Sequence, residues 1–335
     1  MADGVGKVEA DGPPSLGRRA ALLGALGGVA ALTVACSSDP QPTTPPPGAS
    51  SPTPTRNRFA GDPGPGKLYL GLSLAISEPA STVPELGGDR ISLARRFYRA
   101  HQVELMSSVT AGDVAAGILP FVSFKVPDTW DAIARGDDDR WLDGIVEALD
   151  ALDAPAFVAL HHEPENDIEP PHNTPATWVA MQQRLIQRAA STPKVTPVPI
   201  LMNWTFREGS GRDPHEWLVP EAALMGVEVY NPWRPGATNW TSFADLYAQV
   251  AETVTDQPIV VPELGTTSDE FDPRRASLWI QEAFDTALDV GVVGMAWFDA
   301  RLRGTGRREL DQEGRQELRS LLDRPEIARI SPAGG

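Results

Sequence analysis

The chain has 335 residues, of which 41% are hydrophobic, so it is long enough for one large core or two small ones. Its formal net charge of −16 argues against binding to nucleic acid and against charge-driven docking on an anionic membrane, and it leaves neutral or cationic ligands. Cys36 is the only cysteine, so the chain forms no intramolecular disulfide, and the residues after it offer no thiol for a metal site or for nucleophilic catalysis.

Residues 1–36 have the pattern of an export signal. An Arg-Arg pair precedes an apolar run, residues 20–35, which is shorter than the ~20 residues that a membrane-spanning helix needs and fits a signal h-region. The arginine pair resembles a twin-arginine signal, and LTVAC resembles a lipobox, in which Cys36 would be lipidated. We therefore expect an exported protein, either anchored by lipid on the extracytoplasmic face of a membrane or cut near Ala35 and secreted.

Residues 37–66 are rich in Pro, Ser and Thr, and nine of the 32 prolines lie there. Such a composition does not form a packed core and predicts an extended, semi-rigid spacer. Behind a lipid anchor, this spacer would hold a folded domain away from the membrane.

Residues 67–330 alternate strand-like and helix-like segments and precede a short tail, 331–335. The expected strands are 68–75, 96–104, 118–126, 156–163, 198–206, 226–233, 258–266 and 293–301. Apolar residues recur with the period of a helix in 139–152, 177–190, 243–254, 274–290 and 309–322. This alternation predicts a (β/α)8 barrel. The competing fold, a doubly wound open sheet, usually has a Gly-rich phosphate loop after its first strand, and this chain has none.

Polar and aromatic residues gather at the ends of six of the expected strands. In (β/α)8 barrels the active site lies at the C-terminal ends of the strands, so these side chains are expected to meet on one face. They are Ser123, Lys125, His161, His162, Glu163, Glu165, Asn203, Trp204, Glu228, Tyr230, Trp233, Glu263, Trp297, Asp299 and Arg301.

Two glutamates stand out among them, Glu163 at the end of the fourth expected strand and Glu263 at the end of the seventh. Cleavage of a glycosidic bond needs two carboxyl groups, one to protonate the leaving oxygen and one to attack the sugar or to activate water. A separation of about 5–5.5 Å between them indicates retention of stereochemistry, and about 6.5–9.5 Å indicates inversion. The sequence does not give this distance.

The chain resembles glycoside hydrolase family 26, the β-mannanase family, within the clan of retaining (β/α)8 glycosidases. The resemblance rests on the pair His162-Glu163, the segment PELG around Glu263, the segment Glu228-Val229-Tyr230 and the position of Trp297. It implies that Glu163 is the acid/base and Glu263 the nucleophile of a double displacement, that the Tyr230 hydroxyl holds the nucleophile, and that Trp297 stacks on a sugar. After His-Glu the chain reads PEND and lacks the run typical of mannanases, which indicates a divergent relative.

An endo-acting β-glycosidase of this kind would take a polysaccharide or oligosaccharide, with β-mannan as the first expectation. Indole rings offer flat apolar faces to sugars, which predicts stacking on Trp204, Trp233 and Trp297. Hydrogen bonds to sugar hydroxyls are expected from His162, Asn203, Asp299 and Arg301. The mechanism needs neither a metal nor a cofactor, and we expect a monomer.

Other interpretations of the same residues remain open. Glu165 is the rival acid if the fourth strand is longer than expected, although Glu165, Asp167 and Glu169 also fit a solvated loop. His161 and His162 resemble half of a metal site that His101 and His172 would complete. Lys125 fits a salt bridge better than a Schiff base. For the whole chain, the alternative is a carbohydrate-binding lipoprotein that keeps the barrel without turnover.

Overall fold

The computed structural model describes residues 58–331, except 75, 77–78, 81–83, 270–271, 273, 299–300, 303–305 and 308–309. At positions 85, 301, 302, 306 and 307 it describes the backbone alone. The predicted export signal with Cys36, and the spacer as far as residue 57, lie outside the described residues.

The described chain is built around one parallel sheet of nine strands, in the order β5-β4-β3-β2-β1-β9-β8-β7-β6. The strands are β1 (Tyr69–Ser73), β2 (Leu93–Arg99), β3 (Leu119–Lys125), β4 (Ala156–Leu160), β5 (Val195–Pro197), β6 (Ile200–Met202), β7 (Met225–Tyr230), β8 (Ile259–Gly265) and β9 (Gly294–Trp297). A short antiparallel pair, β10 (Arg301–Leu302) and β11 (Gly306–Arg307), follows β9.

The two outermost strands of this order, β5 and β6, are consecutive in the chain and are separated only by Val198 and Pro199. The ladder of β5 joins it to β4 and that of β6 joins it to β7. The N–H of Val198 still donates to the carbonyl of Val158, and the carbonyl of Pro199 accepts from Gly226. The curled sheet is therefore consistent with the predicted (β/α)8 barrel, with a fifth strand that is split in two.

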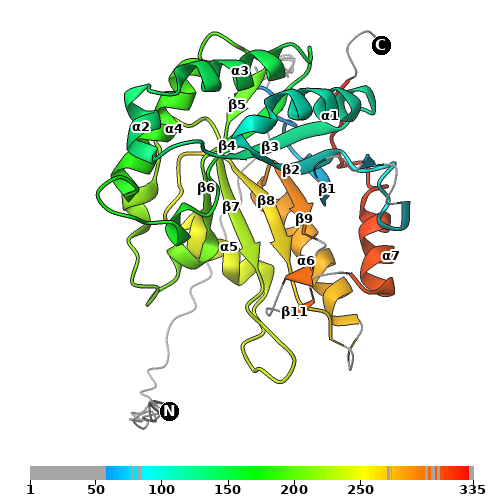
Figure 1. Cartoon of the computed structure of the whole chain (residues 1–335). Coiled ribbons are helices and arrows are strands. Elements are labelled where there is room, and N and C mark those ends of the chain that lie inside the picture. Colours follow the sequence, from blue (N-terminus) through cyan, green and yellow to red (C-terminus); the bar gives the residue numbers. More distant parts are fainter. Residues whose placement is uncertain are drawn as a thin grey trace, which may run out of the picture. The chain divides into compact units, whose positions relative to one another are not determined.

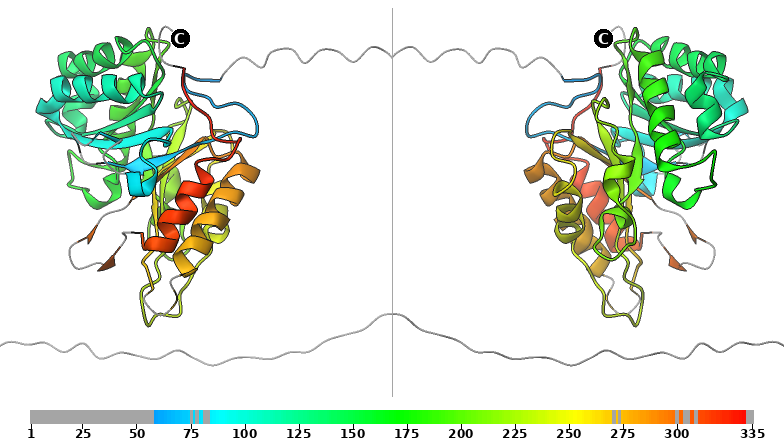
Figure 2. Two further views of the ribbon diagram at one scale, coloured as in Figure 1. Left: turned by 90° about the vertical axis from the view of Figure 1, so that its right-hand side faces the viewer. Right: turned by 90° about the vertical axis from the view of Figure 1, so that its left-hand side faces the viewer.

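Helices cover the outside of the sheet, with α1 to α4 over β2 to β5 and α5 to α7 over β7 to β9 (Figure 1). The α-helices are α1 (Val103–Ala115), α2 (Trp130–Arg135), α3 (Asp139–Asp150), α4 (Pro175–Ala189), α5 (Phe243–Ala251), α6 (Arg274–Val290) and α7 (Gln312–Leu321). The 3₁₀ helices are η2 (Pro84–Leu86), η3 (Ala100–Gln102), η4 (Pro164–Asn166), η5 (Asn203–Phe206) and η6 (Pro214–Trp217). Figure 2 shows α6 and α7 packed side by side.

Side-chain caps set the starts of several of these helices. The hydroxyl of Thr174 accepts from the backbone N–H of Thr177 ahead of α4, and that of Ser242 accepts from Asp245 ahead of α5. Asp311 caps α7 in the same way. Within the described part of the chain, no helix combines the length and the apolar character needed to cross a membrane.

The core has two layers. Alternate side chains of the strands, such as Phe121 and Phe157, fill the inside of the curled sheet. Their neighbours, such as Val122 and Val158, pack between the sheet and the helices. This alternation decides which side chain at each strand end faces the inside of the barrel.

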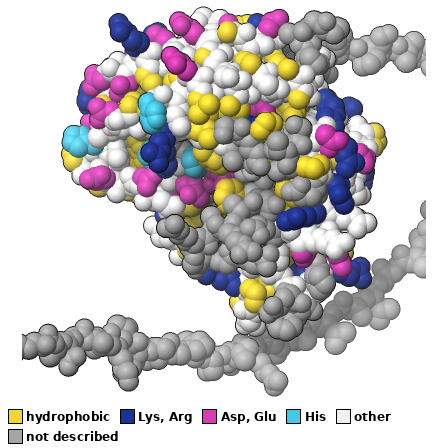
Figure 3. Space-filling model, turned by 45° about the vertical axis from the view of Figure 1, so that its right-hand side comes forward, with side chains coloured by type: hydrophobic (Ala, Val, Ile, Leu, Met, Phe, Trp, Pro, Cys, Tyr) yellow, Lys and Arg dark blue, Asp and Glu magenta, His cyan; other side chains and the backbone are white. Residues whose placement is uncertain are grey.

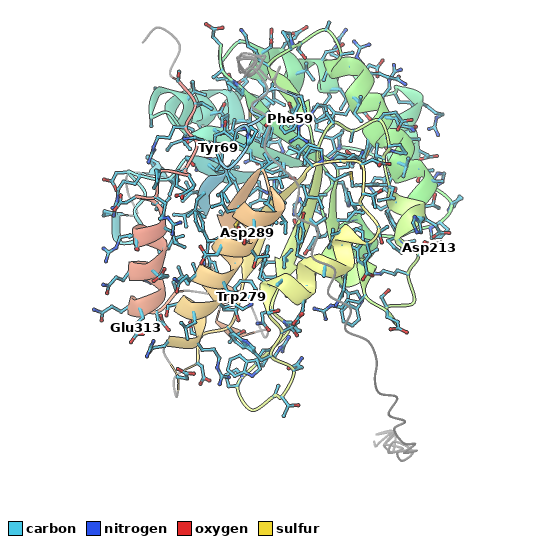
Figure 4. The ribbon with its side chains drawn as sticks, turned by 180° about the vertical axis from the view of Figure 1, so that it is seen from behind. Phe59, Tyr69, Asp213, Trp279, Asp289 and Glu313 are labelled. Atoms are coloured by element: carbon cyan, nitrogen blue, oxygen red, sulfur yellow. The ribbon has the colours of Figure 1, made fainter. Side chains whose placement is uncertain are left out.

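Residues 58–66 belong to the folded body, although the sequence assigned them to the spacer. Phe59 is 8% exposed, and its ring centroid lies 6.2 Å from that of Phe157 at the start of β4 (Figure 4). The Thr196 hydroxyl donates to the carbonyl of Ala60 at 2.9 Å. These two contacts hold a segment rich in Gly and Pro against the end of the barrel where the strands begin.

Candidate active site

A strained turn at the end of β4 orients the first of the two predicted carboxyl groups. His161 and Glu163 have φ values of 47° and 52°, in the left-handed region that residues other than glycine rarely adopt. His162 lies between them, and Pro164 begins η4 directly afterwards. Non-glycine residues in this region cost free energy and are concentrated at functional sites. Glu163 is half-buried at this turn.

An irregularity in β8 orients the second carboxyl group. The register of β8 shifts between Val261 and Leu264 against β9, and a matching shift occurs against β7. Such a bulge re-aims the side chains within it, here Pro262 and Glu263. Glu263 is 6% exposed, and the Tyr230 hydroxyl donates to its Oε2 at 2.7 Å. Glu163 lies close enough for its negative charge to raise the pKa of Glu263.

Burial is the main cause that raises the pKa of Glu263, and three neighbours oppose it. The positive charge of Arg95 lowers this pKa, as do the adjacent carboxyl group of Glu228 and the hydrogen bond from Tyr230. The sequence predicted that Tyr230 would hold Glu263, and the geometry agrees. It did not predict that burial outweighs these partners, nor that Arg95 and Glu228 would be among them.

Arg95 projects from β2 into the barrel and is 0% exposed. Its Cζ lies 4.7 Å from the ring centroids of both Phe97 and Phe121, and its Nη2 is 3.8 Å from Oε1 of Glu263. Burial lowers the pKa of Arg95, but an arginine starts so high that it keeps its charge. The negative charges of Glu263, Glu228 and Glu163 all act on it. The expected strand began at residue 96, so Arg95 was missed. Alternation through LARRFYR, which places Leu93, Arg95 and Phe97 on one face, could have found it.

His162 and Asn203 lie at this face, as predicted for groups that would contact sugar hydroxyls. Nδ1 of His162 is 2.9 Å from the Ser123 hydroxyl, and its ring lies 5.2 Å from that of Phe97. Burial lowers the pKa of His162 well below its usual range, so the ring is neutral at neutral pH. Asn203 is 6% exposed, and its Nδ2 has no acceptor among the described residues. Both side chains therefore keep hydrogen-bonding capacity for a bound molecule.

Among the three predicted stacking tryptophans, Trp204 has the accessible ring. It is 48% exposed directly after β6, and the guanidinium of Arg207 lies 5.2 Å from its centroid. This contact supports one face of the indole, and the exposure leaves surface for an apolar sugar face.

Trp233 and Trp297 are corrections to the predicted sugar-stacking set. Trp297 is 1% exposed and packs 6.1 Å from Trp279 of α6, on the helix side of the sheet (Figure 4). Trp233 is 3% exposed, and Arg275 lies 4.7 Å from its ring centroid. Its edge lines a separate cavity of about 650 Å³ with Trp240. Neither indole offers a free face to the carboxyl groups.

The aromatic side chain that does reach the site from the end of β9 is Phe298, which sequence reasoning missed. Its ring lies 6.1 Å from that of Tyr230 in an edge-to-face contact. The prediction placed Trp297 there because it did not establish which residues of this strand face inward. Asp299 lies outside the described residues, and of Arg301 only the backbone is described.

Glu165 is buried, in contrast to the solvated loop expected for it. It is 4% exposed, and its Oε1 accepts from the N–H of Met202 at 3.0 Å and from the hydroxyl of Thr205 at 2.7 Å. Arg212 donates to the Glu165 carbonyl at 3.1 Å. Burial raises the pKa of Glu165. These contacts join the loop after β4 to the loop after β6.

The histidines do not gather into a metal site within the described residues. His161 pairs with Asp167 at 2.7 Å, and Lys125 reaches the same carboxylate at 2.8 Å, which is the salt bridge expected for this lysine. His172 pairs with Asp131 instead.

Figure 3 shows basic and acidic side chains interspersed on the visible face of the molecule.

Three carboxyl groups, an arginine and a tyrosine thus converge inside the barrel toward the C-terminal ends of parallel strands. Comparison with solved structures shows the same fold: the structural neighbours include glycoside hydrolase family 26 mannanases and other (β/α)8 glycosidases.

The catalytic domain of a family 26 endo-β-1,4-mannanase from Bacillus sp. JAMB-750 superposes with a TM-score of 0.57 and 12% identity, over 80% of this chain and 89% of that one. A modular family 26 endo-β-1,4-mannanase from Cellulomonas fimi gives 0.56 and 12%, over 80% and 73%. A β-mannanase from a symbiotic protist of the termite Reticulitermes speratus, complexed with gluco-manno-oligosaccharide, gives 0.52 and 11%, over 79% and 89%. No protein-family model and no curated protein matches the chain.

Proposed function

We propose that the protein is an exported, retaining endo-β-glycosidase that hydrolyses a β-linked polysaccharide, with β-mannan as the first candidate. The observation that carries the proposal is the environment of Glu263. This carboxyl group is buried, accepts a 2.7 Å hydrogen bond from Tyr230, and lies beside Arg95 and within the electrostatic influence of Glu163. A nucleophilic carboxylate needs such fixed donors and a nearby positive charge.

The two carboxyl groups take different roles because their surroundings differ. Glu163 lies half-buried on a turn at the mouth of the barrel, where it would protonate the leaving oxygen and then accept a proton from water. Glu263 lies deeper and is held by its neighbours, so it would attack the anomeric carbon and form the glycosyl-enzyme. Neutral His162, Asn203 and the exposed ring of Trp204 would bind and orient the sugars.

Export, the cleavage of β-mannan and anchoring through Cys36 belong to the same proposal. Three of the structural neighbours are β-mannanases, and the sequence before residue 37 has the pattern of an export signal. A lipid on Cys36 would attach the enzyme to the extracytoplasmic face of a membrane.

The test is a reducing-sugar assay of the full chain on a panel of β-glycans, beside Glu263→Ala and Glu163→Ala variants. We expect wild-type protein to release reducing ends from one β-glycan, and both variants to lose at least about 10³-fold in rate. The surface variant Glu169→Ala is the matched control and should keep full activity. Binding to a glycan without any release by the wild type would contradict the enzymatic proposal and favour a carbohydrate-binding protein.

A further inference from the structure

Glu228 and Glu263 are neighbours on adjacent parallel strands. Val229 pairs with Leu264 in the ladder between β7 and β8. The residues that precede them, Glu228 and Glu263, therefore lie side by side. Val229 and Leu264 both pack on the helix side of the sheet, which turns Glu228 and Glu263 toward the inside of the barrel. Adjacent strands lie only about 4.8 Å apart, so the two carboxyl groups are within reach of each other.

Apart from Glu263, Glu228 has almost no potential hydrogen-bond partner. It is 1% exposed, and neither of its carboxyl oxygens meets an N–H or O–H donor among the described residues. On Glu263, Oε2 accepts from Tyr230, and Oε1 has Arg95 only at 3.8 Å. An unpartnered buried carboxylate beside a second carboxylate is too costly, so one of the two must hold a proton.

Glu228 is the group that holds it. Burial raises the pKa of Glu228 well above its usual range, and the negative charges of Glu263 and Glu163 raise it further, against the opposing effect of Arg95. For Glu263 the same pairing lowers the pKa, as do Arg95 and Tyr230. Among the described residues, the titratable groups that act on Glu228 are Glu263 from β8, Arg95 from β2 and Glu163 after β4, and Tyr230 follows on the same face of β7.

We infer that Glu228 is a positioning residue, a neutral carboxylic acid whose O–H donates to Oε1 of Glu263 and holds this carboxylate in place for attack. The inference rests on the proposed function, because it assigns Glu263 the role of nucleophile. Tyr230 holds one oxygen of Glu263 and Glu228 the other, so the plane of the carboxylate is fixed by two neutral donors.

The hydrogen bond has a role in both halves of the reaction. When Glu263 forms its bond to the sugar, Glu228 keeps its proton and donates to an oxygen of the ester. When that bond breaks, the electron pair returns to Glu263, and the same donor stabilises the negative charge. Glu228 gains and loses no proton over the cycle, unlike Glu163.

Replacement by glutamine separates this role from that of a charged carboxylate. Glutamine has the same length and donates an N–H where the neutral acid donates an O–H, whereas alanine donates nothing. We expect Glu228→Gln to keep kcat within about tenfold of the wild type and Glu228→Ala to lower kcat about 10²–10³-fold with a small change in KM, the usual cost of losing one such donor. If Glu228→Gln is folded and as slow as Glu228→Ala, Glu228 acts as an ion and the inference is wrong.

A second measurement needs no substrate. Because the folded-state pKa of Glu228 is raised, its contribution to stability is present below the unfolded pKa and is lost as the pH rises through the folded one. Above about pH 4.3, the unfolded pKa of a glutamate, the unfolding midpoint of the wild type should therefore fall more steeply with rising pH than that of Glu228→Gln, which has no proton to lose. Equal slopes would overturn the inference.

The activity assay and the pH-slope measurement test the proposed function and the role of Glu228 independently. Wild-type protein that hydrolyses no glycan would contradict the proposed function, while the difference in pH slope would still report the shared proton. Activity in the wild type together with equal slopes would support the proposed function but contradict the positioning role of Glu228 in it. For the slope measurement Glu313→Gln on α7 is the matched control, because it is the same glutamate-to-glutamine replacement at an exposed position away from the site.

Discussion

Arg95 lies with its guanidinium between two phenylalanine rings and beside the carboxyl group of Glu263. Its positive charge lowers the pKa of Glu263, against the stronger effect of burial. At this scale the sequence predicted Glu163, Glu263 and Tyr230 correctly as a group, because each stands at the end of a recognisable strand. It missed Arg95 because the expected strand began one residue after it, and it chose Trp297 over Phe298 because the inward face was not established.

Arg95→Met keeps the length of the side chain and removes the charge. The pKa of Glu263 should then rise further, so the nucleophile would become ionised only at higher pH. We expect the acidic limb of the kcat/KM profile to move up by roughly one to two pH units, since a neighbouring opposite charge shifts a carboxyl pKa by about that much. The control is Arg99→Met at the exposed end of the same strand, which should leave the profile unchanged. An unmoved acidic limb in Arg95→Met would show that this charge does not act on the nucleophile.

The loops after β4 and β6 form one unit through the side chain of Glu165. Its Oε1 accepts from Met202 and Thr205, and Arg212 donates to its backbone carbonyl.

Among the elements, α6 was predicted with the bounds that it has, since its apolar residues follow a helical period. Helix α1 was missed because VELMSSVTAGDVA has no apolar face, and β2 was placed three residues late. Glu165 was misjudged because a buried acid and a solvated one look the same in a sequence.

Glu165→Ala should reduce the free energy of unfolding by about 1–3 kcal/mol, because the N–H of Met202 and the hydroxyl of Thr205 lose their acceptor in a buried place. Urea denaturation measures this change. Glu169→Ala, an exposed acid in the same loop, should change it by less than about 0.5 kcal/mol. Similar values for the two variants would mean that the loops are held by their backbone alone.

At the scale of the molecule, the folded body begins before the boundary that composition suggested. Phe59 packs against Phe157, and the Ala60 carbonyl accepts from Thr196, at the end of the barrel opposite the carboxyl groups. Composition predicts where a chain cannot form its own core, but it does not show whether a short segment packs on a core made by others. The curled parallel sheet was predictable from eight strand-like segments, whereas the split of the fifth strand was not.

Phe59→Ala should lower stability by about 3 kcal/mol, the usual cost of removing a buried phenylalanine ring. Activity below the unfolding transition should stay unchanged, because the ring lies far from the candidate site. Thermal unfolding with an activity assay at low temperature checks both statements. Leu278→Ala, which truncates an apolar side chain that is 52% exposed, is the control and should be neutral. A neutral Phe59→Ala would return this segment to the spacer.

Because the fifth strand is split, no hydrogen-bond ladder joins β5 to β6. The curled sheet is therefore interrupted along one line, between these two strands. Glu163 follows β4 on one side of this line, and Glu263 lies in β8 on the other. The distance between the two carboxyl groups can therefore change along this line while every ladder stays intact. The hydrogen bonds of Glu165 to Met202 and Thr205 cross it at the end of the barrel that holds the carboxyl groups. This buried side chain thus ties together the two sides of the line.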